Sequence, residues 1–207
     1  MICKRSGWCG RDVGGDVERA VCFSGIGGQG VQLASQAVAR AALADGREVQ
    51  LFGSYGGMMR GGNTETTIVV SDGPVESPPT VADAWAVVLM HHDYSGPTLA
   101  RRRPGGLVLV NSTVFAGHLD RAGGEVLDVP ATALAIEVGN VMAASVVMAG
   151  ALAAVTGLVS APGLEAGVAA ALPPYRRQHV ELNVTALQAG AAAVPAGVTP
   201  AWAGASV

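Results

Sequence analysis

Cysteine is scarce in this chain, which has three cysteines among 207 residues, Cys3, Cys9 and Cys22. Iron–sulfur and zinc sites typically need about four ligands and a C-x-x-C pair, so these cysteines exclude a site of either kind, and no metal ligand set is expected. Cys22 falls inside an apolar run and is interpreted as a small core residue. Reduced thiols suit a reducing compartment, and we therefore expect a cytoplasmic protein.

Charge is also scarce, because charged residues make up 14% of the chain against 50% for hydrophobic residues, and the net charge is -3. Nucleic-acid binding usually requires a concentrated basic patch, so no nucleic-acid partner is expected. The one basic run, Arg101-Arg102-Arg103, is interpreted as a solvated helix end, with a docking patch for an acidic partner as the alternative. The low charge also indicates that partner proteins cover part of the surface.

No secretion signal is visible in residues 1–18, which are polar and contain glycine. We expect a flexible extension over residues 1–18, a single domain over residues 19–188, and a flexible tail of alanine, glycine and proline over residues 189–207.

One uncharged stretch, residues 138–164, is long enough to span a bilayer. Its apolar members are largely alanine, it contains several polar residues, and no aromatic belt flanks it. These features favour a buried helix over residues 140–156, packed against the sheet or a partner subunit, and no membrane partner is expected.

Strand and helix patterns alternate along the predicted domain, which indicates an α/β fold, a three-layer Rossmann-like domain with a mainly parallel sheet. The segment 65–70 comes directly after the second strand and is expected to be a hairpin-like or edge strand. The other expected strands are residues 20–23, 48–52, 84–90, 107–110 and 125–129, and helices are expected over 31–45, around Leu99, over 130–137, and from 164.

A glycine-rich turn, Ser24-Gly25-Ile26-Gly27-Gly28-Gln29-Gly30-Val31, follows the first strand and opens the first helix. Glycines let the backbone approach a ligand, and a helix N-terminus offers unpaired N–H groups and a positive dipole end. Such a turn is typical of a phosphate or pyrophosphate site. The spacing also fits a dinucleotide fingerprint, but Glu48 stands at the beginning of the second strand, not at its end where a ribose-binding acid is needed.

A second glycine-rich segment, Ser54-Tyr55-Gly56-Gly57-Met58-Met59-Arg60-Gly61-Gly62-Asn63, follows the second strand. If both turns lie at the carboxyl ends of their strands, Arg60 is a cation within reach of the same edge. Together the two segments predict a site for a phosphate-bearing ligand.

The two segments and several later motifs resemble the gamma subunit of the 2-oxoacid:ferredoxin (or other acceptor) oxidoreductases, over approximately residues 20–190. The Tyr55-Gly56 and Arg60-Gly61-Gly62 pattern is closest to the 2-oxoglutarate or branched-chain 2-oxoacid types, and Gly57-Met58-Met59 departs from the family pattern. The later motifs are Pro104-Gly105-Gly106, Asn111-Ser112, Val129-Pro130-Ala131-Thr132, Gly139-Asn140, Met148-Ala149-Gly150-Ala151-Leu152 and Leu182-Asn183-Val184-Thr185-Ala186-Leu187.

The resemblance implies a subunit that carries no complete active site and supplies a platform for the phosphates of coenzyme A. Thiamine diphosphate, Mg and the iron–sulfur clusters are then expected in partner alpha and beta subunits, with ferredoxin as the acceptor of the complex. Arg60 would pair with a phosphate oxygen, with a structural clamp or a subunit contact as the alternative, Gln29 would donate to a phosphate and accept from the loop, and Tyr55 and Asn63 would add contacts. The backbone N–H groups that would receive the phosphates are those of Gly25, Ile26, Gly27, Gly28, Gln29 and Gly30.

Two alternatives remain open from the sequence. In one, the chain is an assembly subunit whose glycine loops are interface turns. In the other, it is a free-standing nucleotide-binding or NAD(P)-dependent protein.

Among other polar groups, His91-His92-Asp93 follows a predicted strand. Neighbours in an extended segment point to opposite faces, so this group is not expected to chelate one metal. Ser112 ends a strand without a paired base, and no catalytic residue is assigned.

Overall fold

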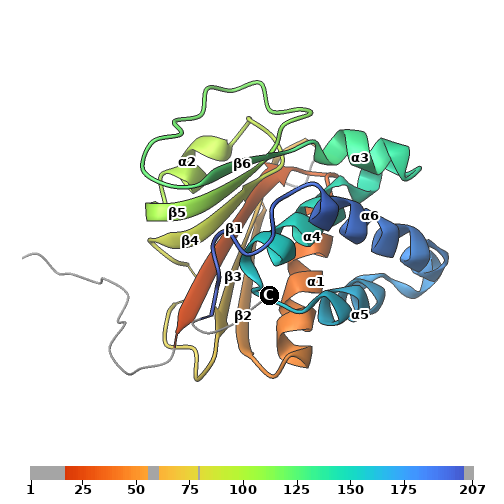
Figure 1. The fold of residues 1–207 in the computed structure, drawn as a ribbon, viewed down its shortest axis with the longest axis horizontal. Coiled ribbons are helices and arrows are strands. Elements are labelled where there is room, and N and C mark those ends of the chain that lie inside the picture. Colours follow the sequence, from red (N-terminus) through yellow and green to blue (C-terminus); the bar gives the residue numbers. More distant parts are fainter. Residues whose placement is uncertain (1–16, 56–60, 79, 203–207) are drawn as a thin grey trace, which may run out of the picture.

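The computed structural model describes residues 17–55, 61–78 and 80–202, and its centre is a six-stranded sheet with the order β2-β3-β1-β4-β5-β6 (Figure 1). Neighbouring strands β1, β4, β5 and β6 are parallel, whereas β3 is antiparallel to both β1 and β2. The strands are β1 (Glu18–Ile26), β2 (Glu48–Tyr55), β3 (Asn63–Ser71), β4 (Ala84–Leu89), β5 (Arg102–Asn111) and β6 (Val126–Val129). The predicted α/β class with a mainly parallel sheet is confirmed.

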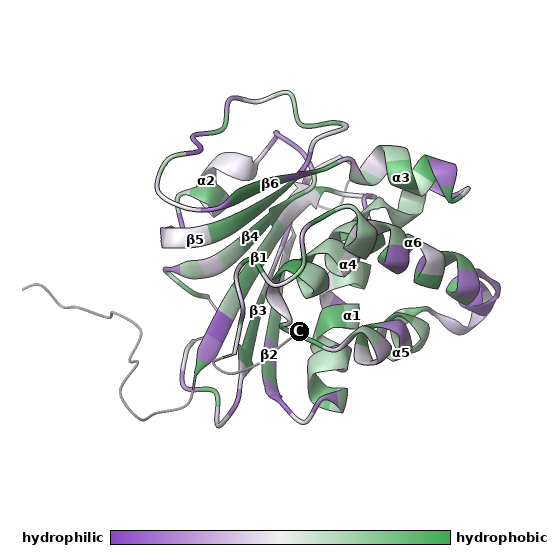
Figure 2. Cartoon of the chain, viewed as in Figure 1, coloured by the Kyte–Doolittle hydropathy of each residue, from purple (hydrophilic) through white to green (hydrophobic). Residues whose placement is uncertain are grey.

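Helices cover both faces of this sheet (Figure 1). On one face lie α1 (Val31–Ala44), α4 (Ala144–Thr156), α5 (Ala161–Ala171) and α6 (Val180–Ala192), with α3 (Ala131–Glu137) beside them. The other face carries the short α2 (Ser95–Leu99) and loop residues such as Val75 and Phe115. Two 3-10 turns, η1 (Val141–Ala143) and η2 (Pro174–His179), precede α4 and α6. Hydrophobic residues are concentrated along the central strands, between these layers (Figure 2).

The hairpin expected after the second strand is present, but β3 is not an edge strand. It lies between β1 and β2, with Ile68 and Val70 in the core on the α1 face of the sheet and Val69 in the smaller core on the opposite face. The run from Thr66 to Val70 is β-branched and buried on both faces. A strand with two buried faces belongs in the interior of a sheet, which explains the central position of β3. The edge strand on this side of the sheet is β2, and β6 is the edge strand on the other side.

The uncharged helix α4 is buried, as expected, with all of its residues except Ala153 and Ala154 shielded from solvent. It packs backbone to backbone against α6, because a Cβ atom at Gly190 would lie 1.9 Å from the carbonyl oxygen of Val147. Within the described ranges, no helix has the length and apolar character needed to cross a membrane.

The C-terminal part of the chain differs from the flexible tail expected from residue 189. Helix α6 continues to Ala192, and Ala201 and Trp202 are buried in the main core. The indole Nε1 of Trp202 donates to the carbonyl oxygen of Leu158 at 3.2 Å, and the Arg47 guanidinium lies 3.9 Å from the indole ring. These contacts hold the segment up to residue 202 on the domain. The expected N-terminal extension, with Cys3 and Cys9, falls almost wholly outside the described residues.

Candidate functional site

The first glycine loop joins the end of β1 to the start of α1, at the carboxyl edge of the sheet. Gly28 and Gly30 have positive φ angles of 105° and 77°, which residues with a side chain rarely adopt. Gly30 is the N-cap of α1, and the first turn of that helix contains no acidic side chain. The unpaired N–H groups and positive dipole end of α1 are therefore not neutralised by a carboxylate of this turn.

The second glycine segment lies against the first. The N–H of Gly27 donates to the carbonyl oxygen of Gly62 at 2.8 Å, and the N–H of Gly61 donates back to Gly27 at 3.3 Å. The β1–β3 register pairs Ile26 with Asn63. The expectation that both segments meet at one edge is confirmed. Arg60 itself, the residue before Gly61, lies outside the described residues.

The side chain of Gln29 folds back into its own loop. Its Oε1 accepts from the N–H of Ile26 at 3.0 Å, and its Nε2 donates to the carbonyl oxygen of Met90, beyond β4, at 3.4 Å. The predicted acceptance from the loop backbone is confirmed. Met90 takes one of the two N–H donors of this amide, and the predicted donation to a phosphate stays a prediction. A Cβ atom at Gly25 would lie 2.7 Å from this Oε1, so the absence of a side chain at Gly25 leaves space for the Gln29 side chain.

Two polar atoms beside the loop are buried without a hydrogen-bond partner in the described part of the chain, Asn63 Oδ1 and Ser145 Oγ. Ser145 belongs to the first turn of α4, and its hydroxyl would lie 2.6 Å from a Cβ atom at Gly30. The start of α4 therefore packs directly under the start of α1. Sequence reasoning did not find this contact, because no local signal links residues separated by more than a hundred positions. Tyr55 ends β2, as expected, but nothing of its side chain is described.

Asn111, at the end of β5, connects two further segments of the same edge. Its Nδ2 donates to Thr132 Oγ1 at 2.8 Å and faces the carbonyl oxygen of Met90 at 3.4 Å, while its Oδ1 accepts from the N–H of Thr132. The Met90 carbonyl oxygen thus accepts hydrogen bonds from the side-chain amides of both Gln29 and Asn111. This arrangement ties the glycine loop to β4, β5 and α3 through polar contacts.

The histidines after β4 do not follow the predicted alternation. The chain turns after Met90, and the rings of His91 and His92 stack with their centroids 4.2 Å apart at 25°. Asp93 Oδ2 lies 3.5 Å from His91 Nδ1, and Asp93 Oδ1 lies 3.6 Å from His92 Nε2. The two imidazoles therefore do not point to opposite faces as predicted, because the backbone is not extended beyond Met90.

On the α2 face of the sheet, Cys22 is buried and donates to or accepts from Thr67 Oγ1 at 3.6 Å. Burial raises the pKa of the Cys22 thiol, and the Thr67 hydrogen bond opposes this only in part. Nearby, Glu65 pairs with Arg101 and accepts from Thr98 Oγ1 at 2.7 Å. Arg101, from the basic run, is thus engaged in an ion pair under α2 and is not a freely solvated helix end.

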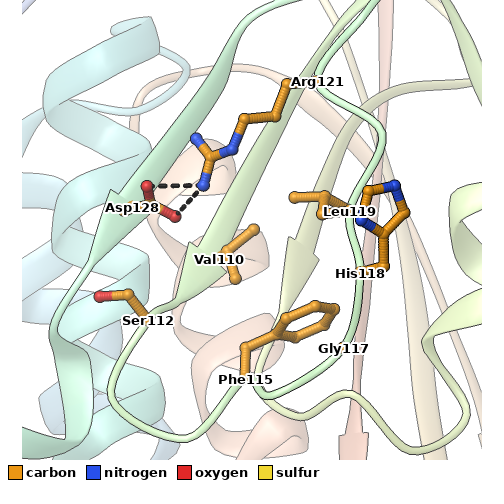
Figure 3. A pocket seen from close by; sticks show the side chains of 8 residues that line it. All are labelled: Val110, Ser112, Phe115, Gly117, His118, Leu119, Arg121 and Asp128. Carbon is orange, nitrogen blue, oxygen red and sulfur yellow. Dashed lines mark hydrogen bonds and ion pairs between the residues drawn. The ribbon is translucent and has the colours of Figure 1, made fainter.

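A hollow of about 420 Å³ lies between β5, β6 and the loop that follows β5 (Figure 3). Arg121 spans it and donates to both carboxylate oxygens of Asp128, at 2.8 and 2.7 Å, so the two charges neutralise each other. None of the residues predicted to bind a ligand lines it. Its walls are Val110, Ser112, Phe115, Gly117, His118, Leu119, Arg121 and Asp128.

Comparison with known proteins identifies the family and agrees with the fold. The chain matches the pyruvate ferredoxin/flavodoxin oxidoreductase family over residues 20–193. It is 32% identical over 181 residues to the 2-oxoglutarate synthase subunit KorC of Methanothermobacter thermautotrophicus, and the alignment covers 84% of this chain and 94% of that one.

Two solved structures share the architecture. The gamma subunit of a keto/oxoacid ferredoxin oxidoreductase from Geobacter sulfurreducens superimposes with a TM-score of 0.74 at 31% identity, covering 85% of this chain and 95% of that one. The 2-oxoglutarate:ferredoxin oxidoreductase from Magnetococcus marinus, solved with 2-oxoglutarate, coenzyme A and succinyl-CoA bound, shares the fold at a TM-score of 0.76 and 17% identity, over 87% of this chain and 32% of that one. The chain therefore belongs to the pyruvate ferredoxin/flavodoxin oxidoreductase family, as a gamma-type subunit of a 2-oxoacid:ferredoxin oxidoreductase.

Proposed function

We propose that this subunit binds the phosphates of coenzyme A at the paired glycine segments and presents the thiol of coenzyme A to the partner subunits. The observation that carries the proposal is the geometry of the loop. Gly27 is hydrogen-bonded to Gly61 and Gly62, and the α1 N-terminus beside them has no acidic side chain in its first turn. A helix N-terminus of this kind attracts phosphate oxygens through N–H groups and dipole alike.

The residues divide into two roles in this proposal. Gln29 holds the loop in shape, because its amide is engaged by Ile26 and Met90. The N–H groups of Ile26, Gly27 and Gln29, predicted to receive phosphates, already donate to protein oxygens. The phosphates are then received by the backbone N–H groups of Gly28, Gly30 and the first turn of α1. Arg60 adds a planar cation suited to a phosphate oxygen. Asn63 adds an amide whose Nδ2 can donate to a phosphate, whereas its Oδ1, which has no partner among the described residues, can accept only from an N–H or O–H of the ligand.

In this proposal the complex converts a 2-oxoacid, coenzyme A and oxidised ferredoxin to acyl-CoA, carbon dioxide and reduced ferredoxin. Thiamine diphosphate with Mg would supply the decarboxylation chemistry and iron–sulfur clusters the path for electrons, both in partner alpha and beta subunits. The buried thiol of Cys22 is unsuited to holding a cluster. Similarity to a 2-oxoglutarate synthase subunit favours 2-oxoglutarate as the first substrate to test.

The test is the Arg60→Ala variant in the complex reconstituted with its thiamine and iron–sulfur subunits. A hydrogen bond between charged groups contributes about 1.5–3 kcal/mol, so the KM for coenzyme A is expected to rise at least about tenfold. The KM for the 2-oxoacid should not change, because the oxoacid does not bind to this platform. Arg40→Ala, which removes an exposed cation from the same domain away from the loop, is the matched control.

Repeating the assay with dephospho-CoA and with pantetheine identifies the phosphate that Arg60 contacts. If Arg60 pairs with a given phosphate, the variant and the wild type should have the same KM for the analogue that lacks it. An unchanged KM for coenzyme A in Arg60→Ala, together with poor recovery of the complex, would instead assign the glycine loops to subunit assembly.

A further inference from the structure

His91, His92 and Asp93 form a compact polar group at the end of β4, outside the glycine loop. One potential ligand atom from each residue lies within 4.8 Å of the other two. The side chains are partly open to solvent, with exposed fractions of 18%, 37% and 58% respectively. An ion can therefore reach the group from solution, and the imidazoles still lie against protein.

The distances within this group fit metal coordination better than hydrogen bonding. Asp93 oxygens lie 3.5 Å from His91 Nδ1 and 3.6 Å from His92 Nε2, which is long for a charge-assisted hydrogen bond. Ligand atoms bound at about 2.0–2.2 Å to a tetrahedral ion lie about 3.3–3.6 Å apart. Each of the two nitrogen–oxygen distances is near this length, but the two involve different oxygens of Asp93. A set with one ligand atom from each residue lies within 4.8 Å, so a rotation of the carboxylate or of one imidazole is needed to close it around an ion.

Metal binding competes with one hydrogen bond at each imidazole. The N–H of Asp93 donates to His91 Nδ1 at 3.1 Å, and binding of an ion through this nitrogen, which has a single lone pair, displaces that N–H. The N–H of Ala116 reaches His92 Nδ1 only at 3.5 Å. Binding through His92 Nε2 moves the proton to Nδ1 and sacrifices this long contact. Phe115 packs edge-on against the His92 ring, 6.2 Å between centroids, and limits its rotation.

We propose that His91, His92 and Asp93 bind one divalent transition-metal ion of the Zn²⁺ type. Two imidazole nitrogens and one carboxylate oxygen are ligands that suit zinc and its neighbours, while magnesium and calcium prefer oxygen alone. Three protein ligands leave a fourth position for water or an anionic group. The site begins one residue after Met90, whose carbonyl oxygen accepts from Gln29, so it lies at the same edge as the glycine loop without sharing its residues.

The experiment measures Zn²⁺ binding to the full untagged chain by calorimetry, with Co²⁺ absorption as a report on the ligands. Cys3→Ser and Cys9→Ser are placed in the background to remove competing thiols. In that background, His91→Ala, His92→Ala and Asp93→Asn are each expected to weaken binding at least about tenfold, since even residues outside the ligand set contribute that much. His118→Ala, a histidine of the neighbouring loop outside the group, is the matched control and should bind as the parent does.

Unfolding temperatures without metal establish that the variants are folded, and Asp93→Asn keeps both the shape of the side chain and the backbone N–H that contacts His91. Bound Zn²⁺ should raise the unfolding temperature of the parent and of His118→Ala, and not of the other three variants. Absence of binding to the parent, or binding that persists in His91→Ala and Asp93→Asn, overturns the proposal. Neither result bears on coenzyme A, which is absent from the assay.

Discussion

Replacement of Gly30 by alanine tests how tightly the glycine loop packs on α4. A Cβ atom at this position would lie 2.6 Å from Ser145 Oγ, although Ser145 Cβ would be 3.7 Å away, at ordinary contact distance. Gly30 also has φ 77° and ψ 14°, a left-handed conformation that costs a residue with a side chain about 1–2 kcal/mol. The substitution therefore combines a conformational cost with a steric one.

Gly157 separates the two costs. It caps α4 at φ 58° and ψ 23°, and a Cβ atom there would meet nothing within 4 Å. Gly157→Ala should destabilise by the conformational cost alone, about 1–2 kcal/mol. Overpacking typically adds about 1–3 kcal/mol, so Gly30→Ala should lower the free energy of unfolding by about 2–5 kcal/mol.

Ser145→Ala removes the atom that causes the crowding. Because Ser145 Oγ is buried with no hydrogen-bond partner in the described part of the chain, this substitution alone should change stability by less than about 1 kcal/mol. The double variant of Gly30 and Ser145 should return to the level of Gly157→Ala, with a coupling energy of about 1–3 kcal/mol. Urea unfolding followed by far-UV circular dichroism measures all four variants. If Gly30→Ala costs no more than Gly157→Ala, or if Ser145→Ala gives no rescue, the close contact between the loop and α4 is refuted.

Two further predictions concern the core. Because burial raises the pKa of Cys22, the unfolded chain loses the thiol proton first as the pH rises above 9.0, and stability should fall there by up to about 1.36 kcal/mol per pH unit until the folded thiol titrates. Urea unfolding measured from about pH 8 to about pH 10 should show that the free energy of unfolding falls less steeply with pH in Cys22→Ala than in the wild type. Equal slopes would contradict the buried thiol. Trp202→Ala should lower the free energy of unfolding by about 3 kcal/mol because it empties a buried site, and Trp202→Phe by about 1 kcal/mol through loss of the Leu158 bond. A loss below about 0.5 kcal/mol for Trp202→Ala would restore the flexible tail predicted from the sequence.

The sequence predicted well wherever local pattern determines structure. The glycine turn between β1 and α1, the meeting of the two glycine segments and the buried helix over residues 140–156 all follow from composition and spacing. Prediction failed where contacts between residues far apart in the sequence determine the structure. A tail rich in alanine and glycine looks disordered, but the sequence does not reveal that Trp202 fills a site between Leu158 and Arg47.

The histidines failed for a different reason. Alternation of side chains holds only while a strand continues, and β4 ends at Leu89, just before the pair. The turn that follows places His91 and His92 on the same side, so their rings stack. The predicted strand ended at Met90, so the error lay in treating residues 91–93 as extended, where the chain turns. Candidate ligands beyond a strand end can be judged only once the conformation of those residues is known.

The position of Gln29 limits how the loop can recognise a ligand. Its Oε1 accepts from Ile26 and one of its two amide N–H groups donates to Met90, so the side chain is held in the loop with at most one N–H left for a ligand. Recognition by the turn itself then falls to N–H groups, which select negative charge and not a base or a sugar. Glu48 begins β2, far from the carboxyl edge where a ribose-binding acid would stand. The loop geometry by itself is therefore common to many phosphate ligands, and the choice of coenzyme A must rest on side chains outside the turn, which is why Arg60 is the decisive residue to change.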